Sequence, residues 1–221
     1  MSGPAPTDHD EALRLCPALK AAEAELVIYE RLLRDWNKRI NLVSASTLDE
    51  VWTRHFADSA QLHELLPQIS RWADLGSGAG FPGMVLALLL KRRPDASVGL
   101  IESDRRKAAF LRAVSRETGA PVKVICGRIE SELPRLAGAV EGVSARALAP
   151  LGQLLDWSGE LLLKNATGAF LKGENWRAEL TGAEAEDNFS LVEMASRTHP
   201  SGRIVVVTRR DRPVSPEGAS P

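Results

Sequence analysis

The segment 74–83, which reads Asp-Leu-Gly-Ser-Gly-Ala-Gly-Phe-Pro-Gly, is the part of the chain best suited to bind a ligand. It lies where a predicted strand turns into a predicted helix. Its glycines permit positive φ angles and a close approach of the backbone to a ligand, and Pro82 suits the first position of the helix. In an open parallel sheet, ligands bind in the crevice past the strand ends. The segment therefore predicts a site for a nucleotide-type cofactor.

The glycines alone are compatible with two kinds of cofactor, a dinucleotide or S-adenosylmethionine. Gly78, Gly80 and Gly83 match the G-x-G-x-x-G pattern of dinucleotide-binding proteins, and Glu102 follows at about the 20-residue spacing expected of a ribose-binding acid. S-adenosylmethionine is favoured because the motif opens with the acidic Asp74 and because the rest of the chain has no room for a separate dehydrogenase substrate domain. An Asp-x-Gly-x-Gly-x-Gly motif with an acid on the second strand resembles class I S-adenosylmethionine-dependent methyltransferases. NAD remains the alternative.

Each residue of this motif has an expected role in binding the cofactor. Gly76, Gly78 and Gly80 would form the turn under its methionine part. Glu102 would accept hydrogen bonds from both ribose hydroxyls, for which a carboxylate is well suited. The alternative for Glu102 is an exposed acid at a strand end. The segment around Ile129 follows the third strand, from which it could reach an adenine.

From Trp72 onwards, short apolar runs alternate with helix-length amphipathic stretches, which predicts βαβ units and a mainly parallel sheet. Seven strands are predicted, at Arg71–Leu75, Val98–Glu102, Val122–Ile125, Gly142–Ala145, Ala169–Lys172, Leu191–Ala195 and Arg203–Thr208. Helices or short turns are predicted at Pro82–Arg92, Arg105–Thr118, Leu133–Leu136, Leu151–Lys164 and Trp176–Thr181. Because no full helix separates the last two strands, they should pair antiparallel. The predicted fold class is α/β, a Rossmann-like seven-stranded mainly parallel sheet.

An N-terminal helical extension is predicted over residues 21–70, before a Rossmann-like core over 71–210. Apolar residues recur at spacings of three and four from Ala22 to Ile40, and a second helical pair is expected from Leu48 to Leu66. Residues 1–20 are expected to be mostly flexible and residues 211–221 to form a disordered tail, because the chain ends are rich in Pro, Ser and Gly.

The balance of charge argues against a protein that coats nucleic acid by bulk electrostatics. Among 221 residues, 28 Lys plus Arg stand against 29 Asp plus Glu, a formal net charge of −1. Any nucleic-acid site must therefore be a local patch. The candidate basic clusters are Arg31, Arg34, Lys38 and Arg39, then Lys91 to Arg93, Arg105 to Lys107, and Arg209, Arg210 and Arg212.

Apolar runs and cysteines point to a cytoplasmic protein with no membrane segment, signal peptide or metal site. The longest apolar run, Met84–Leu90, is far shorter than the roughly 20 residues that span a bilayer. Cys16 and Cys126 lie far apart with no neighbouring histidine, so neither a disulfide framework nor a zinc cluster is indicated.

Five motifs together resemble a known bacterial family. They are Trp36-Asn37-Lys38-Arg39-Ile40-Asn41-Leu42, Arg54-His55-Phe56-Ala57-Asp58-Ser59, the turn from Asp74 to Gly83, Ser144-Ala145-Arg146-Ala147, and Leu171-Lys172-Gly173. Their order and spacing resemble the glucose-inhibited division protein B family of 16S ribosomal RNA guanine-N7 methyltransferases, over roughly Ala21 to Thr208. Glu102 stands where many relatives have Asp, and Ala79 where many have Pro.

The resemblance implies S-adenosylmethionine as cofactor and 16S ribosomal RNA, alone or within the small subunit, as partner. The protein is expected to act as a monomer. It places the cofactor contacts on Gly76, Phe81, Ile129, Glu130 and Arg146. It places pocket and RNA-side positions on Asn41, Arg54, His55, Asp58 and Lys172.

Alternatives to these roles remain open. His55 and Asp58 could form a structural pair that ties the N-terminal helices to the sheet, and Arg146 could pair with Asp74 or Glu130. The protein could also methylate another protein or a small molecule, or bind the cofactor without catalysis.

Guanine N7 carries an in-plane lone pair, so no general base or metal is required, and positioning would dominate catalysis. The basic face of Arg31, Arg34, Lys38 and Arg39, together with Arg105 to Lys107 or Arg209 to Arg212, would dock the RNA.

Overall fold

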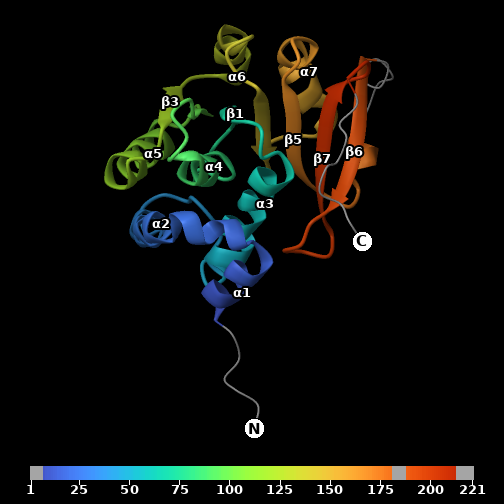
Figure 1. Ribbon diagram of the computed structural model, residues 1–221. Helices are drawn as coiled ribbons and strands as arrows, with labels where there is room; N and C mark the ends of the chain where they lie inside the picture. Colours follow the sequence, from blue (N-terminus) through green and yellow to red (C-terminus); the bar gives the residue numbers. More distant parts are fainter. Residues whose placement is uncertain (1–6, 181–187, 213–221) are drawn as a thin grey trace.

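The fold is built around one seven-stranded sheet, as seen in a computed structural model that describes residues 7–180 and 188–212 (Figure 1). The strands are β1 (Arg71–Leu75), β2 (Ser97–Glu102), β3 (Val122–Cys126), β4 (Gly142–Arg146), β5 (Thr167–Gly173), β6 (Phe189–Ala195) and β7 (Gly202–Arg209). Their order is β3-β2-β1-β4-β5-β7-β6. Strands β1 to β5 are parallel, whereas β7 is antiparallel to both β5 and β6. The predicted mainly parallel sheet is confirmed, as is the antiparallel pairing of the last two strands.

Helices cover both faces of the sheet and enclose two apolar cores. The helices of the sheet region are α4 (Gly83–Leu90), α5 (Arg105–Thr118), α6 (Ile129–Glu132) and α7 (Leu151–Leu163), with 3-10 turns η4 (Leu133–Leu136) and η5 (Trp176–Glu179). Trp72 packs into the core under α4 and α5, and the next residue, Ala73, into the core under α7, because side chains alternate along a strand. Since both faces are covered, β1 is buried from Trp72 to Leu75. The predicted end of the η5 turn, Thr181, lies outside the described residues.

The N-terminal region packs as a group of helices against α4 and α5 (Figure 1). Its elements are α1 (Asp8–Leu15), η1 (Pro17–Ala22), α2 (Glu23–Asn37), η2 (Ala45–Thr47), the π-helical turn η3 (Trp52–Ala57) and α3 (Asp58–Leu65). The predicted stripe continues to Ile40, but α2 ends at Asn37. The Asn37 Oδ1 atom accepts hydrogen bonds from the backbone N–H groups of Leu42 (2.9 Å) and Val43 (3.1 Å), which stabilises the turn after the helix.

The structure differs from the sequence expectation over residues 8–20, which form α1 and most of η1 instead of a mostly flexible segment. The Asp8 carboxylate accepts hydrogen bonds from the backbone N–H groups of Trp52 (2.8 Å) and Thr53 (3.1 Å) at the start of η3. Cys16 and Leu19 are fully buried. These contacts join segments more than 40 residues apart, so no local pattern reveals them. Of the tail predicted to be disordered, residues 213–221 lie outside the described chain.

Candidate active site

The segment 74–83, here called the glycine turn, joins β1 to α4 in a backbone conformation that favours glycine. Gly76, Gly78 and Gly80 have φ angles of 57°, 56° and 99°. A Cβ atom at Gly80 would lie 2.9 Å from Met84 Cβ and would collide with the hydroxyl of Tyr29. Left-handed φ and close contacts thus both require glycine at position 80.

Glu102, at the end of β2, binds the glycine turn directly. Its Oε2 atom accepts a hydrogen bond from the Gly78 N–H (2.8 Å), and its Oε1 atom accepts one from the Asp104 N–H (2.7 Å). Glu102 is only 7% exposed, so it is not an exposed strand-end acid. Each carboxylate oxygen can accept a further hydrogen bond from a ligand hydroxyl.

Asp74 is a fully buried acid at the start of the glycine turn. Its Oδ1 atom accepts a hydrogen bond from Ser144 Oγ of β4 (2.7 Å), whereas its Oδ2 atom has no partner in the described part of the chain. Burial raises the pKa of Asp74 to about 6, against the opposing effect of the Ser144 hydrogen bond. The turn therefore contains a buried acceptor that could bind a ligand or water donor.

Tyr29 of α2 holds the glycine turn from the side of the N-terminal helices. Its hydroxyl donates a hydrogen bond to the backbone carbonyl of Ala79, and its ring stacks on Phe81 with centroids 5.5 Å apart. Tyr29 is fully buried. Tyr29 lies on the apolar stripe predicted between Ala22 and Ile40, and that stripe does not predict this role. Its hydroxyl among aliphatic neighbours is the sequence signal for the contact.

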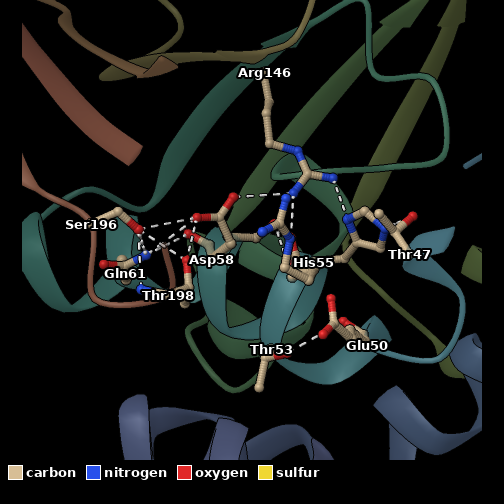
Figure 2. Close-up of polar contacts among 11 residues, drawn as sticks. Thr47, Glu50, Thr53, His55, Asp58, Gln61, Arg146, Ser196 and Thr198 are labelled. Carbon is tan, nitrogen blue, oxygen red and sulfur yellow. Dashed lines mark hydrogen bonds and ion pairs between the residues drawn. The ribbon is translucent and has the colours of Figure 1, made fainter. Parts of the chain in front are cut away.

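A second group of polar side chains, here called the Arg146 cluster, comprises Arg146, Arg54, His55, Asp58 and Phe81. Figure 2 shows the Arg146 guanidinium facing the η3 turn. It donates hydrogen bonds to Arg54 O (2.9 Å), to Asp58 Oδ2 (3.1 Å) and to His55 Nδ1 (2.8 Å). Phe81 joins the cluster to the glycine turn, since His55 stacks on its ring at 4.7 Å and Arg146 lies over it at 4.9 Å.

These contacts decide between the structural alternatives that the sequence left open for Arg146, His55 and Asp58. Arg146 forms its ion pair with Asp58 rather than with Asp74 or Glu130. His55 and Asp58 do tie η3 and α3 to the sheet, each through Arg146 on β4. A π-helical turn is a frequent feature of functional sites, and here it carries both Arg54 and His55.

His55 is held neutral in one tautomer. Because a guanidinium can only donate, Nδ1 of His55 must accept, and Nε2–H is left to donate to Thr47 Oγ1 (3.1 Å; Figure 2). Burial, together with the positive charges of Arg146 and Arg54, lowers the pKa of His55 to about 3. Both ring nitrogens are occupied, so His55 positions its neighbours rather than titrating near neutral pH.

The remaining predicted residues lie outside the Arg146 cluster. Lys172 on β5 donates to Ala149 O (2.9 Å) and pairs with Glu179 (2.5 Å), so it stabilises the loop after β4. Asn41 is exposed and lines a surface cavity beside Arg39. Ile129 is buried and Glu130 is exposed at the start of α6.

Within residues 7–180 and 188–212, no helix is long and apolar enough to cross a membrane. Over the same ranges, no group of three or more His, Cys, Asp or Glu side chains could hold a metal ion.

The fold and the glycine turn define a class of protein. The sheet departs from the dinucleotide-binding order 3-2-1-4-5-6 because the antiparallel β7 lies between β5 and β6. A similar fold occurs in the O-methyltransferase TomG from Streptomyces achromogenes, solved in complex with SAM. The TM-score is 0.56 at 17% identity, over 84% of this chain and 89% of that one. The fold is that of the class I S-adenosylmethionine-dependent methyltransferases.

The chain belongs to the GidB family, rRNA small subunit methyltransferase G, whose family model matches residues 22–203. It is 49% identical over 189 residues to the Ribosomal RNA small subunit methyltransferase G of Methylorubrum extorquens (strain PA1), covering 86% of this chain and 89% of that protein. It is 45% identical over 206 residues to the protein of the same name from Parvibaculum lavamentivorans, covering 93% and 91%. The resemblance inferred from the five sequence motifs is confirmed.

Proposed function

We propose that this protein transfers the methyl group of S-adenosylmethionine to N7 of a guanine in the 16S ribosomal RNA of the small subunit, as a cytoplasmic monomer. The main structural support for this proposal is that the glycine turn and the Arg146 cluster meet at Phe81, whose ring contacts both His55 and Arg146. Membership of the GidB family and the name of the relatives support ribosomal RNA as the substrate.

The residues of the glycine turn fit the cofactor. Gly76 and Gly78 keep the backbone in positive φ, Glu102 ends β2 with spare acceptor capacity, and Asp74 Oδ2 is a buried acceptor that lacks a partner in the described residues. When bound, S-adenosylmethionine supplies a methyl group on positively charged sulfur. The residues proposed to contact the cofactor are Gly76, Gly78, Phe81, Glu102, Ile129, Glu130 and Arg146.

The chemistry proposed for the site is positioning. Guanine N7 attacks through a lone pair that carries no proton, so no side chain has to act as a base. The state of His55 is consistent with a reaction that needs no base, because both of its ring nitrogens are hydrogen-bonded and the ring stays neutral. The Arg54 guanidinium makes no ion pair among the described residues, which leaves it available for an RNA phosphate. Asn41, Asp58 and Lys172 complete the set of substrate-side positions proposed from the family.

The test is transfer of a labelled methyl group from S-adenosylmethionine to small ribosomal subunits from a strain that lacks this gene. The RNA is digested and its nucleosides are identified by mass spectrometry. We expect the label in 7-methylguanosine. Label in ribosomal protein, or cofactor binding without any transfer to RNA, would overturn the proposed substrate and leave the fold standing.

A further inference from the structure

The basic clusters found in the sequence differ in how far their charge is already neutralised. In the α2 cluster, defined as Arg31, Arg34 and Lys38, every cation has a carboxylate partner. The pairs are Arg31 with Glu117 (2.6 Å), Arg34 with Glu30 (2.8 Å) and Lys38 with Asp35 (2.9 Å). Near the C-terminus, Arg209 pairs with Asp211 (2.5 Å). An RNA phosphate would have to compete with these carboxylates.

One surface cavity presents cations that are not neutralised in this way. This cavity, here called the cation pocket, has a volume of about 330 Å³ and is lined by Arg39, Ile40, Asn41, Asp104, Arg106 and Lys107. The side chains of Arg39 and Lys107 make no ion pair and no hydrogen bond with any residue in the described part of the chain. Arg39 is exposed and Lys107 half-buried, so both charges can reach a ligand.

The single acidic residue that lines the cation pocket already has partners within the protein. Asp104 caps α5, because its Oδ1 atom accepts hydrogen bonds from the backbone N–H groups of Arg106 (2.7 Å) and Lys107 (3.2 Å). Its Oδ2 atom lies 3.6 Å from Arg106 Nη2. Three cations and one carboxylate leave a positive excess in the cavity, which favours an anion.

The position of the cation pocket connects it to the glycine turn. The Asp104 N–H donates to Glu102 Oε1, and Glu102 Oε2 accepts from the Gly78 N–H, so one carboxylate links the pocket wall to the turn. The lining contains no aromatic side chain on which a base could stack. These features suit the sugar–phosphate backbone better than a nucleobase.

We propose that the cation pocket binds a backbone phosphate of the substrate RNA through Arg39, Arg106 and Lys107, and so holds the strand beside the glycine turn. This inference rests on the proposed function and names where that RNA is bound. The sequence placed the α2 cluster first in the expected docking surface, together with Arg39. In this proposal the α2 cluster contributes little, since its charges are paired within the protein.

The test compares two double variants in equilibrium binding to unmethylated small ribosomal subunits. Arg39→Gln with Lys107→Gln removes the unpaired charges, whereas Arg31→Gln with Lys38→Gln is the control with the same change of charge on α2. We expect the first variant to bind on the order of tenfold to a hundredfold more weakly, as for lost contacts to a charged group. The slope of log K against log salt should fall in magnitude by about 0.7 to 0.9 for one lost phosphate contact. The control should stay within about twofold of wild type.

Further measurements separate this inference from folding defects and from the proposed function. Arg39→Lys with Lys107→Arg keeps the charges and should restore most of the binding, and S-adenosylmethionine affinity should be unchanged in all variants. Equal RNA affinity and salt slope for the first variant and wild type would overturn the phosphate site, whether or not methyl transfer occurs. Failure of wild type to methylate RNA would instead bear on the proposed function alone.

Discussion

The glycine turn and the Arg146 cluster meet at the ring of Phe81, yet they are assembled in opposite ways. The glycine turn is nearly contiguous in sequence, and its main external partner, Glu102, is 24 residues from Gly78. In the Arg146 cluster, hydrogen bonds join Arg146 to residues 88 to 92 positions away. Local backbone conformation therefore dominates the cofactor side, to which α2 adds the hydrogen bond from Tyr29 to Ala79 O, whereas docking of the N-terminal helices on the sheet creates the other side.

The largest effect is expected for Gly80→Ala in the glycine turn. A Cβ there combines a φ angle of 99° with a distance of 2.9 Å to Met84 Cβ. Strain and overpacking together should lower the free energy of unfolding by about 3 kcal/mol and abolish S-adenosylmethionine binding. Urea unfolding and titration calorimetry measure the two effects.

Gly159→Ala on α7 is the matched control, since a Cβ there meets nothing within 4 Å. It should leave cofactor binding unchanged and stabilise the helix by up to about 1 kcal/mol. If Gly80→Ala were as stable as wild type, the conclusion that backbone conformation and close contacts require glycine at position 80 would be wrong.

Next in size is Arg146→Gln, which should lower the free energy of unfolding by about 2 to 3 kcal/mol. The change leaves Asp58 Oδ2 and Arg54 O without their donor in a site where the side chains of Arg146 and Asp58 are only 17% and 18% exposed. Methyl transfer should be lost as well. Arg135→Gln breaks the exposed pair with Glu132 and should cost less than about 1 kcal/mol. Equal costs for the two variants would show that the Arg146 cluster does not couple the helices to the sheet.

The third prediction concerns pH. Because the pKa of His55 falls from 6.5 to about 3 on folding, its contribution to stability is present above pH 6.5 and is lost as pH falls towards 3. At pH 5.5 the loss relative to pH 7 should be about 1.2 kcal/mol.

Asp74 changes the free energy of unfolding in the opposite direction over part of this pH range. Its pKa is raised to about 6 in the folded protein, so the folded state gains stability as Asp74 is protonated. The useful quantity is therefore the difference between wild type and His55→Asn, whose amide oxygen can replace Nδ1 as acceptor for Arg146. As pH falls from 7.5 to 5, the free energy of unfolding of wild type should fall relative to that of His55→Asn, because only wild type carries the buried imidazole. A variant profile parallel to wild type would contradict a neutral, buried His55.

The smallest effect is expected for Tyr29→Phe, which keeps the ring and removes only the hydrogen bond to Ala79 O. The free energy of unfolding should fall by about 1 kcal/mol, and S-adenosylmethionine affinity should fall several-fold. Ser158→Ala is the matched control, because it removes a buried hydroxyl bonded to Leu154 O on α7. It should cost similar stability without changing cofactor affinity. Unchanged cofactor affinity in Tyr29→Phe would mean that α2 does not position the glycine turn.

The sequence alone was sufficient for the seven strands, the mainly parallel sheet and the glycine turn. Strand β1 and helix α5 begin and end at the predicted residues. Apolar alternation, helical periodicity and the steric freedom of glycine act over a few residues, so they can be read from short stretches of chain. The family resemblance depended on motifs of the same short range.

Tertiary structure decided the rest, because it sets which distant groups come within a few ångströms of each other. It placed β7 between β5 and β6, and it ordered residues 8–20 through the Asp8 carboxylate. It also paired Arg31 with Glu117 while leaving the Arg39 side chain without an ion pair within residues 7–180 and 188–212, a difference that the sequence does not contain. Charge pairing, burial and pKa all depend on the neighbours of a side chain, and those neighbours are fixed only when the segments pack.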